Sequence, residues 1–89
     1  MQTSRAVLLY MKPDCHLCEI ARGWLEDFAA DLDQFAPLTL DEIDIRRDPA
    51  VFDEYRYRIP VILVDGTIVA EGRMDDAAQL ALTRALMKR

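Results

Sequence analysis

The stretch Tyr10–Cys18 constrains the fold more than any other, because it places two cysteines three residues apart between two apolar segments. The preceding run, Ala6–Tyr10, is short and apolar, as is typical of a buried strand. The following segment has apolar residues at helical spacing, namely Leu17, Ile20, Ala21, Trp24, Leu25 and Phe28. Pro13 suits a first helical turn and Asp14 can accept hydrogen bonds from its unpaired amides. The sequence therefore predicts a strand, a turn and a helix that carries both cysteines in its first turn.

Two cysteines in this position form a candidate redox pair. Residues three apart on a helical turn lie about 5–6 Å from one another, within the Cα range that a disulfide needs. The unpaired amides of a helix start stabilise a thiolate. Cys15, at the helix end, is expected to be the exposed sulfur that attacks. Cys18 shares a face with Ala21 and Leu25, so we expect it to point inward and to act second, by thiolate exchange.

Length and charge narrow the class of protein. A chain of 89 residues is expected to form a single domain, residues 1–89, and an apolar content of 52% is enough for its core. The net charge is −5 and no stripe of lysine or arginine is present, which argues against nucleic acid or an anionic membrane as partner. The first residues contain no apolar stretch of signal or membrane-span length, so the reducing cytoplasm is the expected location. A structural disulfide is disfavoured there, and a monomer is expected.

The remaining segments predict an α/β domain. A first helix is expected from about Cys15 to the Asp31–Asp33 region. Gly23 lies in its interior at a cost of about 1 kcal/mol, and either close packing of the helix on a neighbour or sequence drift would explain the presence of this glycine. The later elements are a strand Leu38–Ile45, a helix starting at Asp48–Pro49, a strand Pro60–Val64, a tight Asp65–Gly66 turn, a strand Thr67–Ala70 and a helix from Asp75–Asp76. The order is β-α-β-α-β-β-α. It predicts a mixed four-stranded sheet with helices on its faces, in which the first two strands are parallel.

Pro60 follows Ile59 and opens the third predicted strand. A proline at such a position can be held in the cis form by the surrounding fold. The element order, the cysteine pair and this proline can therefore be compared with known families as one pattern.

The whole pattern resembles that of the glutaredoxins. The matching features are a strand, Lys-Pro-x-Cys-x-x-Cys at a helix start, Ile-Pro-Val at a later strand, a strand–turn–strand unit and a last helix. More narrowly, the chain is similar to small glutaredoxin-like proteins that carry Lys-Pro-x-Cys-His-Leu-Cys and Ile-Pro-Val-x-x-x-Asp-Gly. The resemblance covers essentially the whole chain and implies a thioredoxin/glutaredoxin-like fold.

The resemblance also implies roles for individual residues. Cys15 matches the nucleophile and Cys18 the resolving cysteine of the family. Pro60 matches a cis-proline that faces the cysteines, and Ile59 offers backbone groups to a bound thiol substrate. Lys12 matches a basic residue that contacts a carboxylate of glutathione.

The chain departs from the glutaredoxin pattern at three places, and one of them is Arg58-Ile59-Pro60, where Thr-Val-Pro is typical. His16 and Leu17 stand between the cysteines where Pro-Tyr is usual, and both are expected to contact the substrate. The segment Glu71–Asp75 replaces Gly-Gly-x-Asp, which puts the negative charge of Glu71 near where an anionic tripeptide would lie. If His16 is protonated it stabilises the Cys15 thiolate; the alternative is an exposed spacer.

The function that these features predict is thiol–disulfide oxidoreduction in cell redox homeostasis, acting on protein disulfides or glutathione mixed disulfides. The partners would be a disulfide-bearing protein or glutathione, together with a reductase or thiol reductant. No cofactor is required, and glutathione is a candidate reductant or substrate.

Two other functions are open. One is a non-catalytic binding module that keeps the fold with idle cysteines. The other is a metal or iron–sulfur site bridging two subunits. A closed zinc site within one chain is disfavoured, because His16 is the only histidine and no third cysteine exists. A last pair of interpretations concerns Tyr55 and Tyr57, which either pack the short second helix or, less favoured, line a partner groove with Arg56 and Arg58.

Overall fold

Strands and helices follow one another in the predicted order in the computed structural model, which describes residues 4–88. The elements are β1 (Arg5–Met11), α1 (His16–Ala30), β2 (Leu38–Asp44), the 3₁₀ turn η1 (Ile45–Arg47), α2 (Pro49–Tyr55), β3 (Val61–Val64), β4 (Thr67–Glu71) and α3 (Asp76–Leu86). Within these residues no helix has the length and apolar character needed to cross a membrane.

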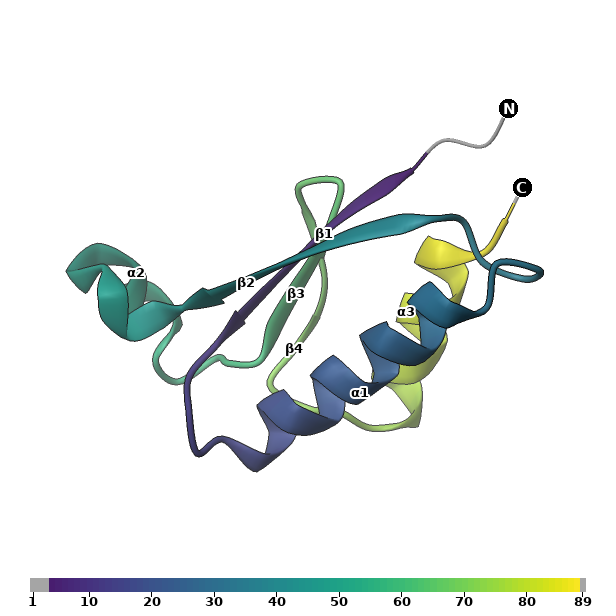
Figure 1. Cartoon of the computed structure of the whole chain (residues 1–89). Helices are drawn as coiled ribbons and strands as arrows, with labels where there is room; N and C mark the ends of the chain where they lie inside the picture. Colours follow the sequence, from purple (N-terminus) through teal and green to yellow (C-terminus); the bar gives the residue numbers. More distant parts are fainter. Residues whose placement is uncertain (1–3, 89) are drawn as a thin grey trace.

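The strands form one four-stranded mixed sheet in the order β2-β1-β3-β4. β1 is parallel to β2, with Tyr10 opposite Ile43, and antiparallel to β3, with Tyr10 opposite Val61. β3 and β4 form the antiparallel hairpin. The prediction of a parallel first pair followed by a hairpin is confirmed, and the sheet with its three helices has a thioredoxin-like fold (Figure 1).

One face of the sheet carries the main core. Apolar residues of the strands pack there against α1 and α3, which lie on the same side of the sheet in Figure 1. The fully or almost fully buried members are Val7, Leu9, Ala21, Leu25, Phe28, Ile62, Val64, Ala70, Leu82 and Leu86. Side chains alternate between the two faces of a strand, so Tyr10 points to the opposite face. There its ring stacks on Tyr55 of α2, with ring centroids 4.4 Å apart.

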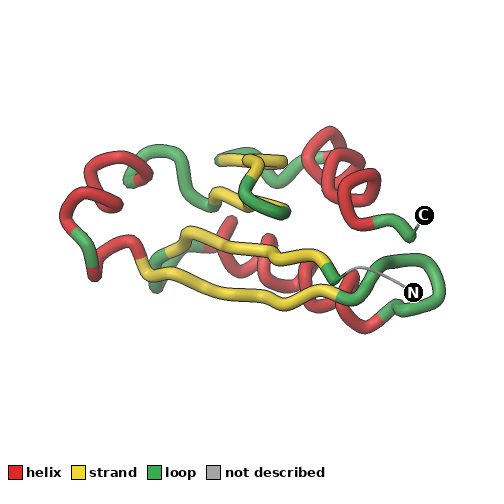
Figure 2. Tube along the Cα trace, turned by 90° about the horizontal axis from the view of Figure 1, so that it is seen from above, coloured by secondary structure: helices red, strands yellow, loops and turns green. Residues whose placement is uncertain are grey.

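α2 lies beyond the carboxyl end of β1 (Figure 2). The stacking of Tyr55 on Tyr10 supports the interpretation that this tyrosine packs the short helix. Tyr57, by contrast, is 84% exposed. At the other end of the sheet the last turn of α3 meets the loop after α1, where the Ala36 amide donates to the Leu86 carbonyl over 2.9 Å.

Several boundaries were predicted correctly from local signals. Asp48 caps α2 and accepts from the amides of Ala50 and Val51, and Asp75 caps α3 by accepting from Ala78. Asp65 and Gly66 both have positive φ, 50° and 85°, as the predicted tight turn requires.

Other boundaries were wrong. The helix cap at the first cysteine is Cys15 itself and not Asp14, which has φ 58° and lies in the turn before the helix. α1 ends at Ala30, earlier than expected. β2 stops at Asp44, because its carboxylate accepts from the Arg46 amide and starts η1, so Ile45 belongs to that turn and not to the strand.

Gly23 and Pro60 also differ in detail from the predictions. A Cβ added to Gly23 would meet nothing within 4 Å, so close packing does not explain this glycine. Pro60 lies just before β3, which starts at Val61.

Candidate functional site

The segment from Lys12 to Cys15 turns the chain from β1 into α1. Pro13 and Asp14 form this turn, and the positive φ of Asp14, 58°, reverses the chain direction. Cys15 follows with extended backbone, φ −112°, and is the N-cap of the helix. The turn therefore delivers the Cys15 sulfur to the end of α1, where backbone amides have no partner within the helix.

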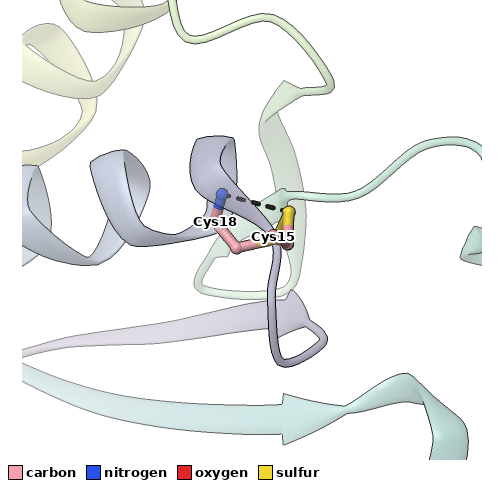
Figure 3. Close-up of a disulfide and its surroundings, with 2 residues drawn as sticks. All are labelled: Cys15 and Cys18. Carbon is pink, nitrogen blue, oxygen red and sulfur yellow. Dashed lines mark hydrogen bonds between the residues drawn. A yellow bond between two sulfur atoms is a disulfide. The ribbon is translucent and has the colours of Figure 1, made fainter.

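Cys15 and Cys18 are joined by a disulfide, and their Cα atoms are 5.2 Å apart. The Cys15 sulfur also accepts a hydrogen bond from the Cys18 amide over 3.2 Å (Figure 3). The Cys15 carbonyl accepts from the Glu19 amide over 3.1 Å, which continues the helical pattern. In the reduced state the same amide and the helix dipole would stabilise a Cys15 thiolate.

The two sulfurs differ in access to solvent. Cys18 is 3% exposed and lies on the face of α1 that carries Ala21 and Leu25, as its spacing indicates. Cys15 is partly exposed. An incoming disulfide could therefore reach the Cys15 sulfur, whereas the buried Cys18 sulfur is placed to react with the Cys15 sulfur itself.

The Ile59–Pro60 bond is cis. Pro60 is almost completely buried, and its carbonyl accepts from the Gly72 amide over 2.8 Å. Because Val61 pairs with Tyr10, the residues just before β3 lie beside the end of β1 that leads to the cysteines. The sheet register thus brings Pro60 to the same end of the molecule as Cys15.

The backbone of Ile59 is less available than the family resemblance implies. Its amide donates to the Tyr55 carbonyl over 3.1 Å. Because the Ile59 amide is used in this hydrogen bond, a bound substrate would have to contact the Ile59 carbonyl instead.

The other expected contact residues lie around the first turn of α1. Lys12 is exposed in the turn, and His16 is the exposed first residue of the helix. Leu17 is 42% exposed, a large value for a leucine, and follows directly. Among residues 4–88, no group of three histidine, cysteine or acidic side chains is arranged to hold a metal ion.

Sequence reasoning missed a charged cluster that surrounds Arg58. The Arg58 Nε donates to Glu71 Oε2 over 2.7 Å, and its Nη1 donates to Glu54 Oε1 over 2.6 Å. The guanidinium also lies over the Tyr55 ring, 4.9 Å from its centroid. Hydrogen bonding from Arg58 lowers the pKa of Glu71 below its usual value. The four-residue spacing of Glu54 and Arg58 is typical of a helical ion pair and could have predicted that contact. Glu71 lies at the end of β4, thirteen residues after Arg58, and no local pattern predicts its contact.

The comparisons with known proteins agree with this architecture. The sequence model of the glutaredoxin-like domain (DUF836) matches residues 6–84. No curated protein sequence matches the chain.

Solved structures with a similar fold come from several sources. A protein of unknown function from Staphylococcus aureus has a TM-score of 0.68 at 15% identity, with 92% of this chain and 90% of that chain covered. A thioredoxin-like protein has a TM-score of 0.56 at 24% identity, covering 86% and 95%. Thioredoxin 1 from Thermosipho africanus has a TM-score of 0.56 at 13% identity, covering 89% of each chain. At these identities the similarity supports the fold.

Proposed function

This chain belongs to the glutaredoxin-like family, and on that premise we propose that it is a thiol–disulfide oxidoreductase whose redox pair is Cys15 and Cys18. The observation that carries the proposal is the hydrogen bond from the Cys18 amide to the Cys15 sulfur, 3.2 Å long, at the start of α1. At this position the Cys15 sulfur is partly exposed, the Cys18 amide favours its thiolate, and the buried Cys18 sulfur lies within bonding distance.

The reaction begins with the reduced pair. The Cys15 thiolate attacks one sulfur of a substrate disulfide and forms a mixed disulfide, and the other substrate sulfur leaves as a thiolate that takes up a proton. Cys18, once deprotonated, then attacks the Cys15 sulfur and releases the second substrate thiolate. The substrate disulfide is thereby reduced by two electrons, and the Cys15–Cys18 dithiol is oxidised to a disulfide. A thiol reductant such as glutathione, or a dithiol reductase, restores the pair.

The neighbouring residues would hold the substrate at Cys15. Leu17 would offer an apolar contact to the substrate beside Cys15, and His16 and Lys12 would offer it hydrogen-bond donors. Ile59, which is partly exposed, would face the substrate just before β3, and the buried Pro60 would hold this segment in place. A reducing compartment such as the cytoplasm would keep the pair in its active dithiol form.

The test is a redox titration of the purified protein in glutathione and dithiothreitol buffers, with alkylation and mass spectrometry as readout. We expect a reversible intramolecular disulfide with a potential between about −180 and −280 mV. Failure to form this disulfide at any poise would overturn the proposal.

Two matched variants assign the sulfurs. Cys15→Ser should lose disulfide reduction by about a hundredfold or more, because the exposed nucleophile is gone. Cys18→Ser should still attack once and accumulate the mixed disulfide, since the resolving sulfur is missing. Full activity in Cys15→Ser would show that the nucleophile is wrongly assigned.

A further inference from the structure

Arg58 and Glu71 flank the segment that the proposed function assigns to the substrate. Arg58 stands two residues before Pro60 in sequence. Glu71 pairs with Val61 across the β3–β4 hairpin, and the residue after it donates its amide to the Pro60 carbonyl. Their side chains are 34% and 41% exposed, so both can be reached by a bound molecule.

The hydrogen-bonding capacity of Arg58 is largely used inside the chain. Two of its nitrogens contact Glu71, Nε over 2.7 Å and Nη2 over 3.4 Å. Nη1 contacts Glu54 over 2.6 Å, and the ring of Tyr55 lies against the guanidinium. These contacts use three of the five N–H donors of Arg58, so a substrate carboxylate could take the paired Nε and Nη2 donors only by displacing Glu71.

The charge of this cluster is negative, because two carboxylates face one guanidinium. The Glu54 side chain is 61% exposed, so part of its charge is directed to solvent. Glu71 is ionised at neutral pH, since the ordinary pKa of a glutamate, 4.5, already lies well below 7 and Arg58 lowers it further. The cluster therefore repels an anionic substrate and attracts a cationic one.

The nearby start of α3 offers no substitute site for an anion. Asp75 caps this helix and accepts from the Ala78 amide over 3.0 Å, and Asp76 adds a second carboxylate in the first turn. The exposed cations at the same end of the sheet are Lys12, Arg46, Arg47, Arg56 and Arg73, of which Arg46 is paired with Asp44. Arg58, two residues before Pro60, is held by Glu71 and Glu54.

We propose that the Arg58–Glu71 ion pair determines substrate class: it withholds Arg58 from anionic molecules and directs the redox pair to protein disulfides flanked by neutral or basic side chains. This inference rests on the proposed function. It predicts that glutathione disulfide, which carries a net negative charge, is a poorer substrate than a basic peptide disulfide.

The experiment measures single-turnover reduction of a short symmetrical peptide disulfide, made with Glu, Gln or Lys on both sides of its cysteine. Pre-reduced protein is mixed with each peptide, quenched with acid and separated by chromatography. We expect the Lys peptide to react about tenfold faster than the Glu peptide at low salt, with a smaller ratio in high salt. Oxidised glutathione should behave like the Glu peptide.

Glu71→Gln is the informative variant. It removes one negative charge and loosens the grip on Arg58, so the rate with the Glu peptide should rise about threefold and the rate with the Lys peptide should fall. Asp65→Asn is the matched control, because it removes a carboxylate paired with Arg5 at the opposite end of β3. It should leave the ratio of the two rates unchanged.

The outcomes separate this inference from the proposed function. If the Gln peptide is not reduced at all, the oxidoreductase function itself fails. If all three peptides react equally, or the Glu peptide reacts fastest, the function stands and the selectivity inference is wrong. If Glu71→Gln slows every peptide by the same factor, the ion pair supports the Pro60 segment and does not select by charge, which also overturns the inference.

Discussion

The two ends of the sheet are held together by different interactions. At the end near the chain termini, Phe28 and Phe35 pack edge to face, with centroids 4.7 Å apart, Phe35 bridges to Met87, and a single ion pair joins Arg5 to Asp65 beside the tight turn. At the cysteine end, the chain is shaped by exposed ion pairs and by unusual backbone at Asp14, the cis Ile59–Pro60 bond and Gly72.

The proposed chemistry lies at one end of a core that reaches both ends of the sheet, since Ile45, Val61 and Cys18 are buried at the cysteine end. Apolar burial stabilises a fold without needing accessible groups. A reacting sulfur, in contrast, must stay accessible, and the groups around it are polar and partly exposed. Mutations should therefore be able to change the stability of the fold without changing the reactivity of the cysteine pair, and the reverse.

The largest effect on stability is expected from Leu86→Ala in the last turn of α3. Leu86 is fully buried in the main core, so its truncation should lower the free energy of unfolding by about 2–5 kcal/mol. The thermal midpoint should fall by roughly 10 °C or more. Calorimetry measures this change, and the redox titration measures the potential of the cysteine pair on the same protein.

Leu86→Met is the control, with an expected loss below about 1.5 kcal/mol. For both variants the potential should remain that of the wild type at temperatures where the protein is folded. A potential that changes in step with stability would show that the two ends are coupled.

Two glycines allow a smaller and more specific test. Gly66 has φ 85° and open space around an added Cβ, so Gly66→Ala should cost about 1 kcal/mol through backbone strain alone. Gly23 has the same open space but lies in a helix interior, where Gly23→Ala should stabilise by about 1 kcal/mol. Urea unfolding of both variants gives the sign. Equal effects would contradict the assignment of the Asp65–Gly66 turn.

The smallest effect concerns acid. The Ala6 amide and then Arg5 lower the pKa of Asp65 below its ordinary value of 3.8, and Arg58 lowers the pKa of Glu71 below 4.5. Carboxyl groups with lowered pKa in the folded state contribute stability that is complete above their unfolded pKa and is lost as the pH falls through their folded pKa. The urea midpoint of the wild type should therefore fall below about pH 4.5.

Asp65→Asn and Glu71→Gln should each flatten this acid limb slightly, because exposed ion pairs contribute little. Asparagine also tolerates the positive φ at position 65. Only Glu71→Gln should change the preference among peptide disulfides. An acid limb identical to that of the wild type in both variants would mean that neither pair contributes to folding.

Much of the fold could be predicted because its signals are local. The cysteine pair, the caps at Asp48 and Asp75 and the turn at Asp65–Gly66 each depend on neighbours within about four residues. The spacing of Cys18 with Ala21 and Leu25 also indicated that this sulfur is buried, as the structure confirms. The choice of helix cap was wrong, because Asp14 is a good cap by composition but the turn places it one residue too early.

By itself, then, the sequence determined the order of the elements, the helix start that carries both cysteines and the family to which the chain belongs. Tertiary structure alone decided what surrounds them. Arg58 meets Glu71 only because the β3–β4 hairpin and the end of α2 converge beside Pro60, and the Ile59 amide is engaged only because α2 ends where it does. Local sequence patterns cannot show such contacts, since partners that are distant in the chain become neighbours through the register of the sheet and the packing of the helices on it.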